Sequence, residues 1–200
     1  MKKNFFIIIF FIFFSTILIN KAYTYSSDPK EFIAEIVDEA KKILVDTNSQ
    51  EFKEKKLSEI ALKAADIKGI GYYTLGKYRK KLNEEQLNEY SKLFEKYFLK
   101  SFTSRLTDYS DPKIEVLSVE VLSPKYTIVK SLLLATEKKP EVKIDWRIYT
   151  KDPDNPLIRD LIVEGLSLAR TQKEEFASVI ENNDGDVTKL FAVLKEFIDK

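Results

Sequence analysis

The chain has 200 residues, 44% hydrophobic and 32% charged, and its 33 basic and 32 acidic side chains leave a formal net charge of +1. This length and composition are those of one folded domain with its own core. Histidine and cysteine are both absent, which excludes a Ser-His-Asp triad, a Cys-His pair, ordinary zinc and haem sites, disulfides and a lipidated cysteine, so we predict no metal and no cofactor.

The first 22 residues form a candidate export signal. Lys2 and Lys3 precede an apolar stretch of fifteen residues, from Phe5 to Ile19. A stretch of this length suits a secretory signal and falls short of the roughly 20 residues that span a bilayer. We therefore predict a signal peptide over 1–22 and a single mature domain over 23–200, with a membrane anchor as the alternative.

The mature chain is close to neutral. Removing the three lysines of residues 1–22 leaves 30 basic against 32 acidic residues, a net charge of −2. Nucleic-acid binding normally needs a concentrated excess of positive charge. We therefore expect no nucleic-acid partner.

Helical patterns fill the first half of the mature chain. Apolar residues at three-and-four spacing predict amphipathic helices over 28–45 and 50–65, the first opened by Asp28 with a proline behind it. A short third helix, interrupted by two close glycines, is expected before Lys81. Four elements are therefore predicted up to residue 109, the fourth being a long helix.

The long helix begins at a capping box. Asn83 is followed three residues later by Gln86, a pairing that satisfies two backbone N–H groups at a helix start. Large apolar side chains, most of them aromatic, then recur every three or four residues to Tyr109. Such a stripe is typical of a core, and it can also form the wall of a ligand cavity.

The period changes after residue 113. Runs over 115–122, 126–136, 142–149 and 157–163 alternate or are continuously apolar and are separated by turn residues, which predicts an antiparallel meander. Ser167 and Asp186 then begin two final helices. Helices, strands and helices in this order predict an α+β fold, with a four-stranded antiparallel sheet and the helices packed on one of its faces.

A basic run lies between the third and fourth helices. Lys77, Arg79, Lys80 and Lys81 follow a segment rich in tyrosine. Cations at the end of a helix interact favourably with its dipole, which is one explanation of the run. The other is contact with a partner or with an anionic head group.

Carboxylates on the strands allow a catalytic hypothesis. Asp145, Asp160 and Glu164 could face a pocket, and an Asp there could act as a general base. Carboxylates on strands are more often exposed or held as buried hydrogen-bonded groups. An enzyme with Asp145 or Asp160 as base is therefore the alternative function.

Two stretches resemble the MlaC family, the periplasmic phospholipid-binding proteins also called the toluene-tolerance family. The first is "YYTLGKYRKKLNEEQLNEYSKLFEKYFLKSF" and the second is "RDLIVEGLSLARTQKEEFASVI". The matching positions are Leu75-Gly76 with Tyr78, Asn83 to Gln86, Asp160, Glu164 to Ser167, and Phe176.

The chain departs from the family pattern just before Asp160. Where the family commonly has Trp and a second aromatic residue, this chain has Pro156 and Arg159. Trp146, on the neighbouring predicted strand, could replace part of the missing bulk.

The resemblance implies a periplasmic carrier, not an enzyme, that moves phospholipid between the outer membrane and an inner-membrane ABC transporter and so serves outer-membrane lipid asymmetry. Its family partners are that transporter complex and an outer-membrane lipoprotein complex. The implied fold is an NTF2-like cone that encloses an apolar cavity, and we expect a monomer. A membrane-anchored adaptor without ligand is a further alternative.

The side chains expected to hold the lipid are apolar or aromatic and come from the helices and the sheet. They are Ile70, Tyr73, Tyr78, Phe94, Tyr97, Phe98, Phe102, Leu132, Leu134, Val142, Ile144, Trp146 and Ile148. The tyrosines are expected near the mouth, where a hydroxyl can stay hydrated. The basic residues Lys77, Arg79, Lys80 and Lys81 are expected to contact head groups or a partner.

Overall fold

The structure is a computed structural model, and it describes residues 24–137 and 139–200. Its helices are α1 (Pro29–Val45), α2 (Gln50–Ala64), α3 (Ile67–Leu75), the 3-10 helix η1 (Gly76–Lys81), α4 (Glu84–Thr107), α5 (Leu168–Glu181) and α6 (Val187–Asp199). Its strands are β1 (Ile114–Ser123), β2 (Tyr126–Leu133), β3 (Val142–Tyr149), β4 (Leu157–Val163) and β5 (Leu166–Ser167). The predicted signal peptide lies outside the described residues.

The strands form one antiparallel sheet in the order β1-β2-β3-β4-β5. The sheet therefore has five strands and not the predicted four. The fifth has only two residues, too few for a recognisable period, and follows β4 through a turn in which Glu164 and Gly165 both have positive φ. The α+β class is confirmed.

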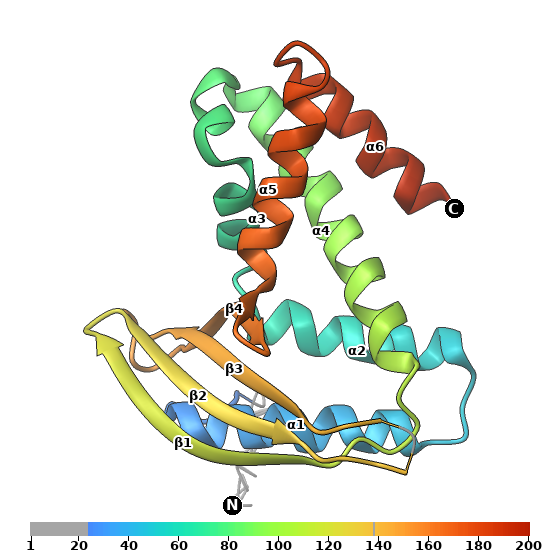
Figure 1. The fold of residues 1–200 in the computed structure, drawn as a ribbon, viewed down its shortest axis with the longest axis vertical. Coiled ribbons are helices and arrows are strands. Elements are labelled where there is room, and N and C mark those ends of the chain that lie inside the picture. Colours follow the sequence, from blue (N-terminus) through green and yellow to red (C-terminus); the bar gives the residue numbers. More distant parts are fainter. Residues whose placement is uncertain (1–23, 138) are drawn as a thin grey trace, which may run out of the picture.

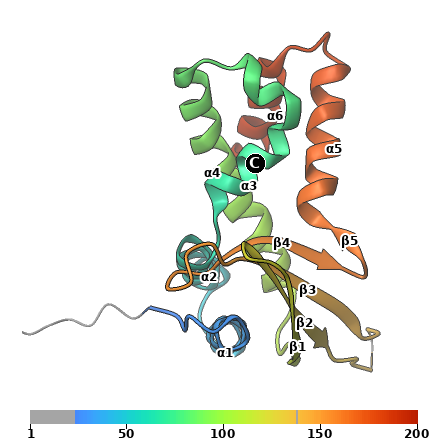
Figure 2. The same cartoon turned by 90° about the vertical axis from the view of Figure 1, so that its left-hand side faces the viewer.

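The molecule consists of two units, each with its own cluster of buried apolar side chains (Figures 1 and 2). In the sheet unit, α1 and α2 pack against the sheet, and β1 and β2 curve around α1. In the helical unit, α3, η1, α4, α5 and α6 pack on one another beyond the edge formed by β4 and β5. The prediction that all helices cover one face of the sheet is therefore wrong, because the helices of the helical unit bury their apolar faces mainly against each other.

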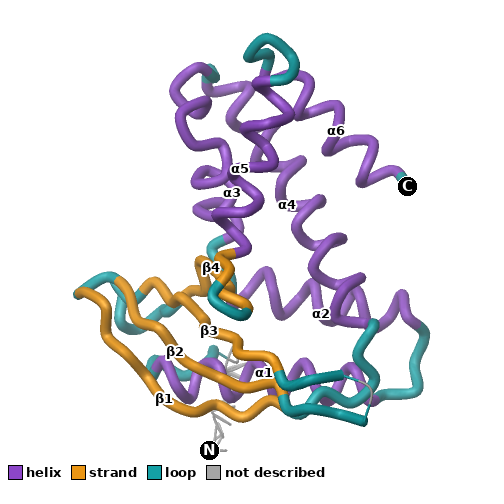
Figure 3. Tube along the Cα trace, viewed as in Figure 1, coloured by secondary structure: helices purple, strands orange, loops and turns teal. Residues whose placement is uncertain are grey.

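Several connections hold the units together. The long helix α4 runs from the helical unit to α2, where Leu106 joins the cluster of the sheet unit. Helix α5 starts directly from β5 and packs on β4. The backbone N–H of Asp66, between α2 and α3, donates to the carbonyl of Ile158 in β4 at 3.0 Å. Figure 3 shows the helices of the helical unit above and the sheet below in this view.

Side-chain caps fix the ends of these helices where the sequence indicated. Asp28 accepts from the N–H groups of Lys30 and Glu31, and Asn83 and Gln86 form the complete capping box of α4. Ser167 caps α5 and Asp186 caps α6. In the part of the chain that the structure describes, no helix combines the length and hydropathy needed to cross a membrane.

Candidate functional site

A cavity of about 410 Å³ lies between the sheet unit and the helical unit. Its walls come from α1, α2, α3, α4, α5 and from all strands except β5, so every part of the fold but the last helix, η1 and β5 contributes to it. Most of the lining is aliphatic or aromatic. A volume of this size is in the range of small-molecule sites, and an apolar lining favours a ligand with a hydrocarbon surface.

The sequence identified much of this lining. Eight of the thirteen side chains expected to contact lipid line the cavity: Ile70, Phe94, Tyr97, Phe98, Phe102, Val142, Ile144 and Trp146. The aromatic stripe of α4 supplies four of them. Phe98 and Phe102 stack with their ring centroids 5.8 Å apart and their planes 10° apart.

Trp146 contributes apolar surface without an unpaired polar atom. Its indole N–H donates to Oγ of Ser131 at 2.8 Å, and the Ser131 hydroxyl donates to the carbonyl of Ile144 at 3.0 Å. Ser131 belongs to β2, and Ile144 and Trp146 belong to the adjacent strand β3. This chain of hydrogen bonds fixes the ring orientation against the cavity and keeps the wall apolar.

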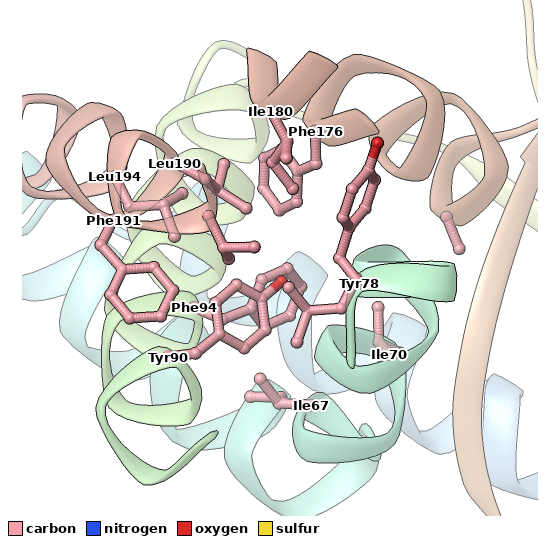
Figure 4. Packing of buried hydrophobic residues seen from close by; sticks show 13 residues of the cluster. Ile67, Ile70, Tyr78, Tyr90, Phe94, Phe176, Ile180, Leu190, Phe191 and Leu194 are labelled. Atoms are coloured by element: carbon pink, nitrogen blue, oxygen red, sulfur yellow. The ribbon is translucent and has the colours of Figure 1, made fainter. Parts of the chain in front are cut away.

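Two of the expected tyrosines lie elsewhere. The ring of Tyr78 is buried in the cluster of the helical unit, and its hydroxyl donates to a carboxylate oxygen of Glu181 at 2.9 Å (Figure 4). Tyr73 is 46% exposed and lines a different hollow. Tyr78 belongs to the 3-10 helix η1, whose side chains point in directions that an α-helical period does not give, and Tyr73 lies on the exposed side of α3.

Three expected strand residues also lie outside the cavity lining. Leu133 faces the cavity, and its neighbours Leu132 and Leu134 do not. Three consecutive leucines show no alternation, so the sequence could not assign their faces. Ile148 is on the correct face of β3 but is completely buried in the core of the sheet unit.

Helices α1 and α2 provide walls of the cavity that the sequence did not indicate. Small or medium-sized apolar side chains from these helices line the cavity, among them Ile36, Val37, Ala40, Leu57, Ile60, Ala61 and Ala64. Their three-and-four spacing was visible in the sequence, because these residues form the apolar faces of the two predicted helices. A helix face that meets a core and one that meets a cavity have the same period.

The rim of the cavity is polar. Tyr97 on α4 donates its hydroxyl proton to Oε1 of Gln172 on α5 at 2.7 Å, and the side-chain amide of Gln172 donates to Glu175 at 2.9 Å. Burial, followed by the nearby charge of Glu175, raises the pKa of Tyr97. Arg105 and Glu175 are exposed lining residues, which places the opening to solvent between α4 and α5.

Asp160, one of the two candidate catalytic bases, has a structural role. Asp160 is 5% exposed and accepts from Arg147 at 3.1 Å, from the Ser167 hydroxyl at 2.6 Å and from the N–H of Ala169 at 3.0 Å. It thereby ties β4 to the start of α5. Asp145 does not line the cavity. Asp160 lines the cavity, but its oxygens accept these three hydrogen bonds, so it is not a free base facing an apolar ligand.

The basic run lies on the helical unit, away from the cavity. Nζ of Lys77 is 2.8 Å from a carboxylate oxygen of Glu181, and the Arg79 guanidinium lies 4.2 Å from the ring centre of Tyr72. Lys80 is exposed, and the Lys81 ammonium lies 5.2 Å from the ring of Tyr78. None of the four lines the cavity.

Comparison with known proteins agrees with this geometry. A solved structure of a phospholipid-binding protein from Ralstonia solanacearum, in complex with a phospholipid, superimposes with a TM-score of 0.71 over 84% of this chain and 94% of that one, at 19% sequence identity. No curated protein sequence matches significantly. The sequence model described as MlaC protein matches residues 33–196. The chain therefore belongs to the MlaC family.

Proposed function

We propose that this member of the MlaC family is a periplasmic phospholipid carrier that holds the acyl chains of its ligand in the cavity between the two units. The observation that carries the proposal is the apolar lining of that cavity by α1, α2, α4 and the sheet. The Ralstonia solanacearum protein, which shares the fold, binds a phospholipid. The same function is therefore inferred for this chain from its own cavity.

The energy of acyl-chain transfer explains why a carrier is needed. Exposing about thirty methylenes to water at about 0.8 kcal/mol each costs more than 20 kcal/mol, so free diffusion of a phospholipid through an aqueous compartment is negligible. A cavity that approximately matches the bilayer as a solvent removes this barrier. The direction of transport must then come from a partner that uses energy.

The polar rim suits the other end of the ligand. Arg105 and Glu175 mark the opening, and Gln172 links Tyr97 to Glu175 across the rim. A phospholipid whose tails enter between α4 and α5 would leave its head group among these hydrogen-bonding side chains. The head group would therefore remain hydrated while the tails are buried.

Export and partners complete the proposal. Residues 1–22 would direct the chain to the periplasm, and an inner-membrane ABC transporter complex and an outer-membrane lipoprotein complex would exchange lipid with it. A monomer is sufficient for this role, because one chain forms the whole cavity. A catalytic role has no support from the hydrogen-bonded Asp160.

Transfer from liposomes to the purified mature protein tests the proposal. A labelled phospholipid should move to the wild-type protein and co-elute with it. A Phe98→Asp variant should remain folded and take up no lipid, because a charge in the apolar wall must be desolvated when the tails bind. Leu132→Asp, on β2 but outside the cavity lining, is the control and should load normally. Equal loading of all three proteins would contradict the proposal.

A further inference from the structure

A second hollow, of about 460 Å³, lies on the helical unit and is basic and aromatic. It is lined by Tyr72, Tyr73, Gly76, Arg79, Lys80 and Lys173. This set, from α3, η1 and α5, contains three cations, two phenols and no carboxylate. We call it the basic hollow. It shares no lining residue with the lipid cavity, so the head group of a lipid held there is not what occupies it.

The cations of the basic hollow are positioned by aromatic rings. The Arg79 guanidinium lies 4.2 Å from the ring centre of Tyr72, and the Lys173 ammonium lies 5.2 Å from that of Tyr73. The Lys68 ammonium also lies near this group, 5.7 Å from the ring centre of Tyr72. Such contacts hold a cation in place without neutralising it, so its charge remains available to an anion.

The local sequence concentrates positive charge around the basic hollow. Residues 67–83 contain Lys68, Lys77, Arg79, Lys80 and Lys81 and no acidic residue, in a chain whose charges otherwise nearly balance. Among the described residues, only Lys77 of these five is within ion-pair distance of a carboxylate, that of Glu181. A favourable interaction with the dipole of a short helix needs only one or two cations, so it does not explain the whole basic run.

We propose that the basic hollow is a docking surface for anionic phospholipid head groups at a bilayer surface. Clusters of four to eight lysines and arginines bind anionic bilayers, and tyrosine favours the polar–apolar boundary of a bilayer. The hollow is open to solvent and brings Arg79, Lys80 and Lys173 together, an arrangement that suits a phosphate-bearing head group presented at a surface. The proposal goes beyond lipid carriage, because the basic hollow and the cavity act independently.

Vesicle co-sedimentation of the mature protein tests this surface. Wild-type protein should pellet with vesicles of phosphatidylcholine containing phosphatidylglycerol, and much less with vesicles of phosphatidylcholine alone. Raising the salt to about 1 M, where the screening length is about 3 Å, should release it. Equal pelleting with both kinds of vesicle, or none with either, would overturn the proposal and leave an acidic protein segment as the remaining partner for the basic hollow.

Matched variants separate the basic hollow from general charge. The triple variant Arg79→Gln, Lys80→Gln and Lys173→Gln should bind anionic vesicles about 100-fold more weakly, at about 1 kcal/mol per basic residue. A control variant removes three exposed lysines of the sheet unit, with the changes Lys42→Gln, Lys55→Gln and Lys63→Gln. The control should bind nearly as well as wild type, and an equal loss in both variants would contradict a specific site.

Lipid content distinguishes this proposal from the carrier proposal. The triple variant of the basic hollow should still retain phospholipid in its cavity, since none of its changed residues lines that cavity. Phe98→Asp should still pellet with anionic vesicles although it carries no lipid. A cavity variant that lost vesicle binding would show that lipid loading, and not the basic hollow, causes sedimentation.

Discussion

Arg159 on β4 is joined to Asp66, which lies between α2 and α3, with its Nε 2.7 Å from Oδ2 of that carboxylate. The guanidinium also donates to the Tyr126 hydroxyl at 3.0 Å and lies 3.7 Å from the ring centre of Tyr149. Asp66 in turn caps α3 by accepting from the N–H of Gly69. Arg159 thus connects the sheet unit to the first helix of the helical unit.

Replacing Arg159 should therefore loosen the connection between the units. Arg159→Met should lower the free energy of unfolding by about 2 kcal/mol, because charge-assisted hydrogen bonds to a partly buried carboxylate are lost. Asp66→Asn should lose the ion pair but keep the cap of α3, and Asp66→Ala should lose both and be less stable than Asp66→Asn. Denaturant unfolding measures each value.

A surface pair provides the comparison for this prediction. Lys200 and Glu196 form an ion pair on the exposed side of α6. Lys200→Met should leave the unfolding midpoint unchanged, because exposed ion pairs contribute little to stability. If Arg159→Met were as neutral as Lys200→Met, the structural role assigned to Arg159 would be wrong.

The buried carboxylate of Asp160 should matter for folding and not for chemistry. Asp160→Ala should destabilise the protein by about 3 kcal/mol, since removing one partner of a buried charge pair leaves its other partners unsatisfied. Those partners are Arg147, the Ser167 hydroxyl and the N–H of Ala169. Asp145→Ala should change stability by less than about 0.5 kcal/mol, as surface substitutions usually do. Thermal unfolding of both variants decides between these roles.

Filling the cavity should reduce lipid uptake without destabilising the fold. Ala40 on α1 lines the cavity, and Ala34 on the same helix does not. Ala40→Leu should reduce the amount of lipid bound while keeping or raising the unfolding midpoint, because the added methyl groups occupy space that the structure leaves empty. Ala34→Leu should not alter lipid uptake. Normal uptake by Ala40→Leu would remove α1 from the lipid site.

Two tyrosines should ionise late in an alkaline titration. Burial raises the pKa of Tyr90, whose hydroxyl lies 2.8 Å from the Thr74 hydroxyl, and burial followed by the charge of Glu175 raises that of Tyr97. Free tyrosine ionises near pH 10. Because both pKa values are raised in the folded protein, the stability they contribute is complete below about pH 10 and is lost as the pH rises through the folded-state values.

Phenolate absorbance during the titration checks this assignment. Tyr90→Phe and Tyr97→Phe should each remove one phenol from the late part of the curve and leave the early part as it is in wild type. A loss from the early part in either variant would show that the hydroxyl concerned is accessible to solvent in the folded protein.

The sequence predicted local structure well because its signals are local. Asp28, Asn83, Ser167 and Asp186 begin helices where the side-chain pattern indicated, and the strand periods matched β1 to β4 within a few residues. The arrangement of the helices was not predictable in this way. Period alone does not say whether an apolar face packs on a sheet or on other helices.

The lining residues of the cavity could be predicted only where they lie together on one face of a single helix or strand. The aromatic stripe of α4 lines the cavity because the whole helix borders both units. Tyr78 was misplaced because η1 changes the helical period, and Leu132 because its neighbours are also leucines. The docking of the two units decides which apolar side chains of α1 and α2 line the cavity. The sequence pattern does not directly encode this docking.

Mass spectrometry of the organic extract of the purified mature protein tests the central claim most directly. We expect a diacyl phospholipid in about one-to-one ratio with the chain, still bound after gel filtration, and a native mass equal to the sum of the two. A protein of bare chain mass that stays empty after incubation with liposomes would contradict lipid carriage and leave only the fold in common with the phospholipid-binding relative.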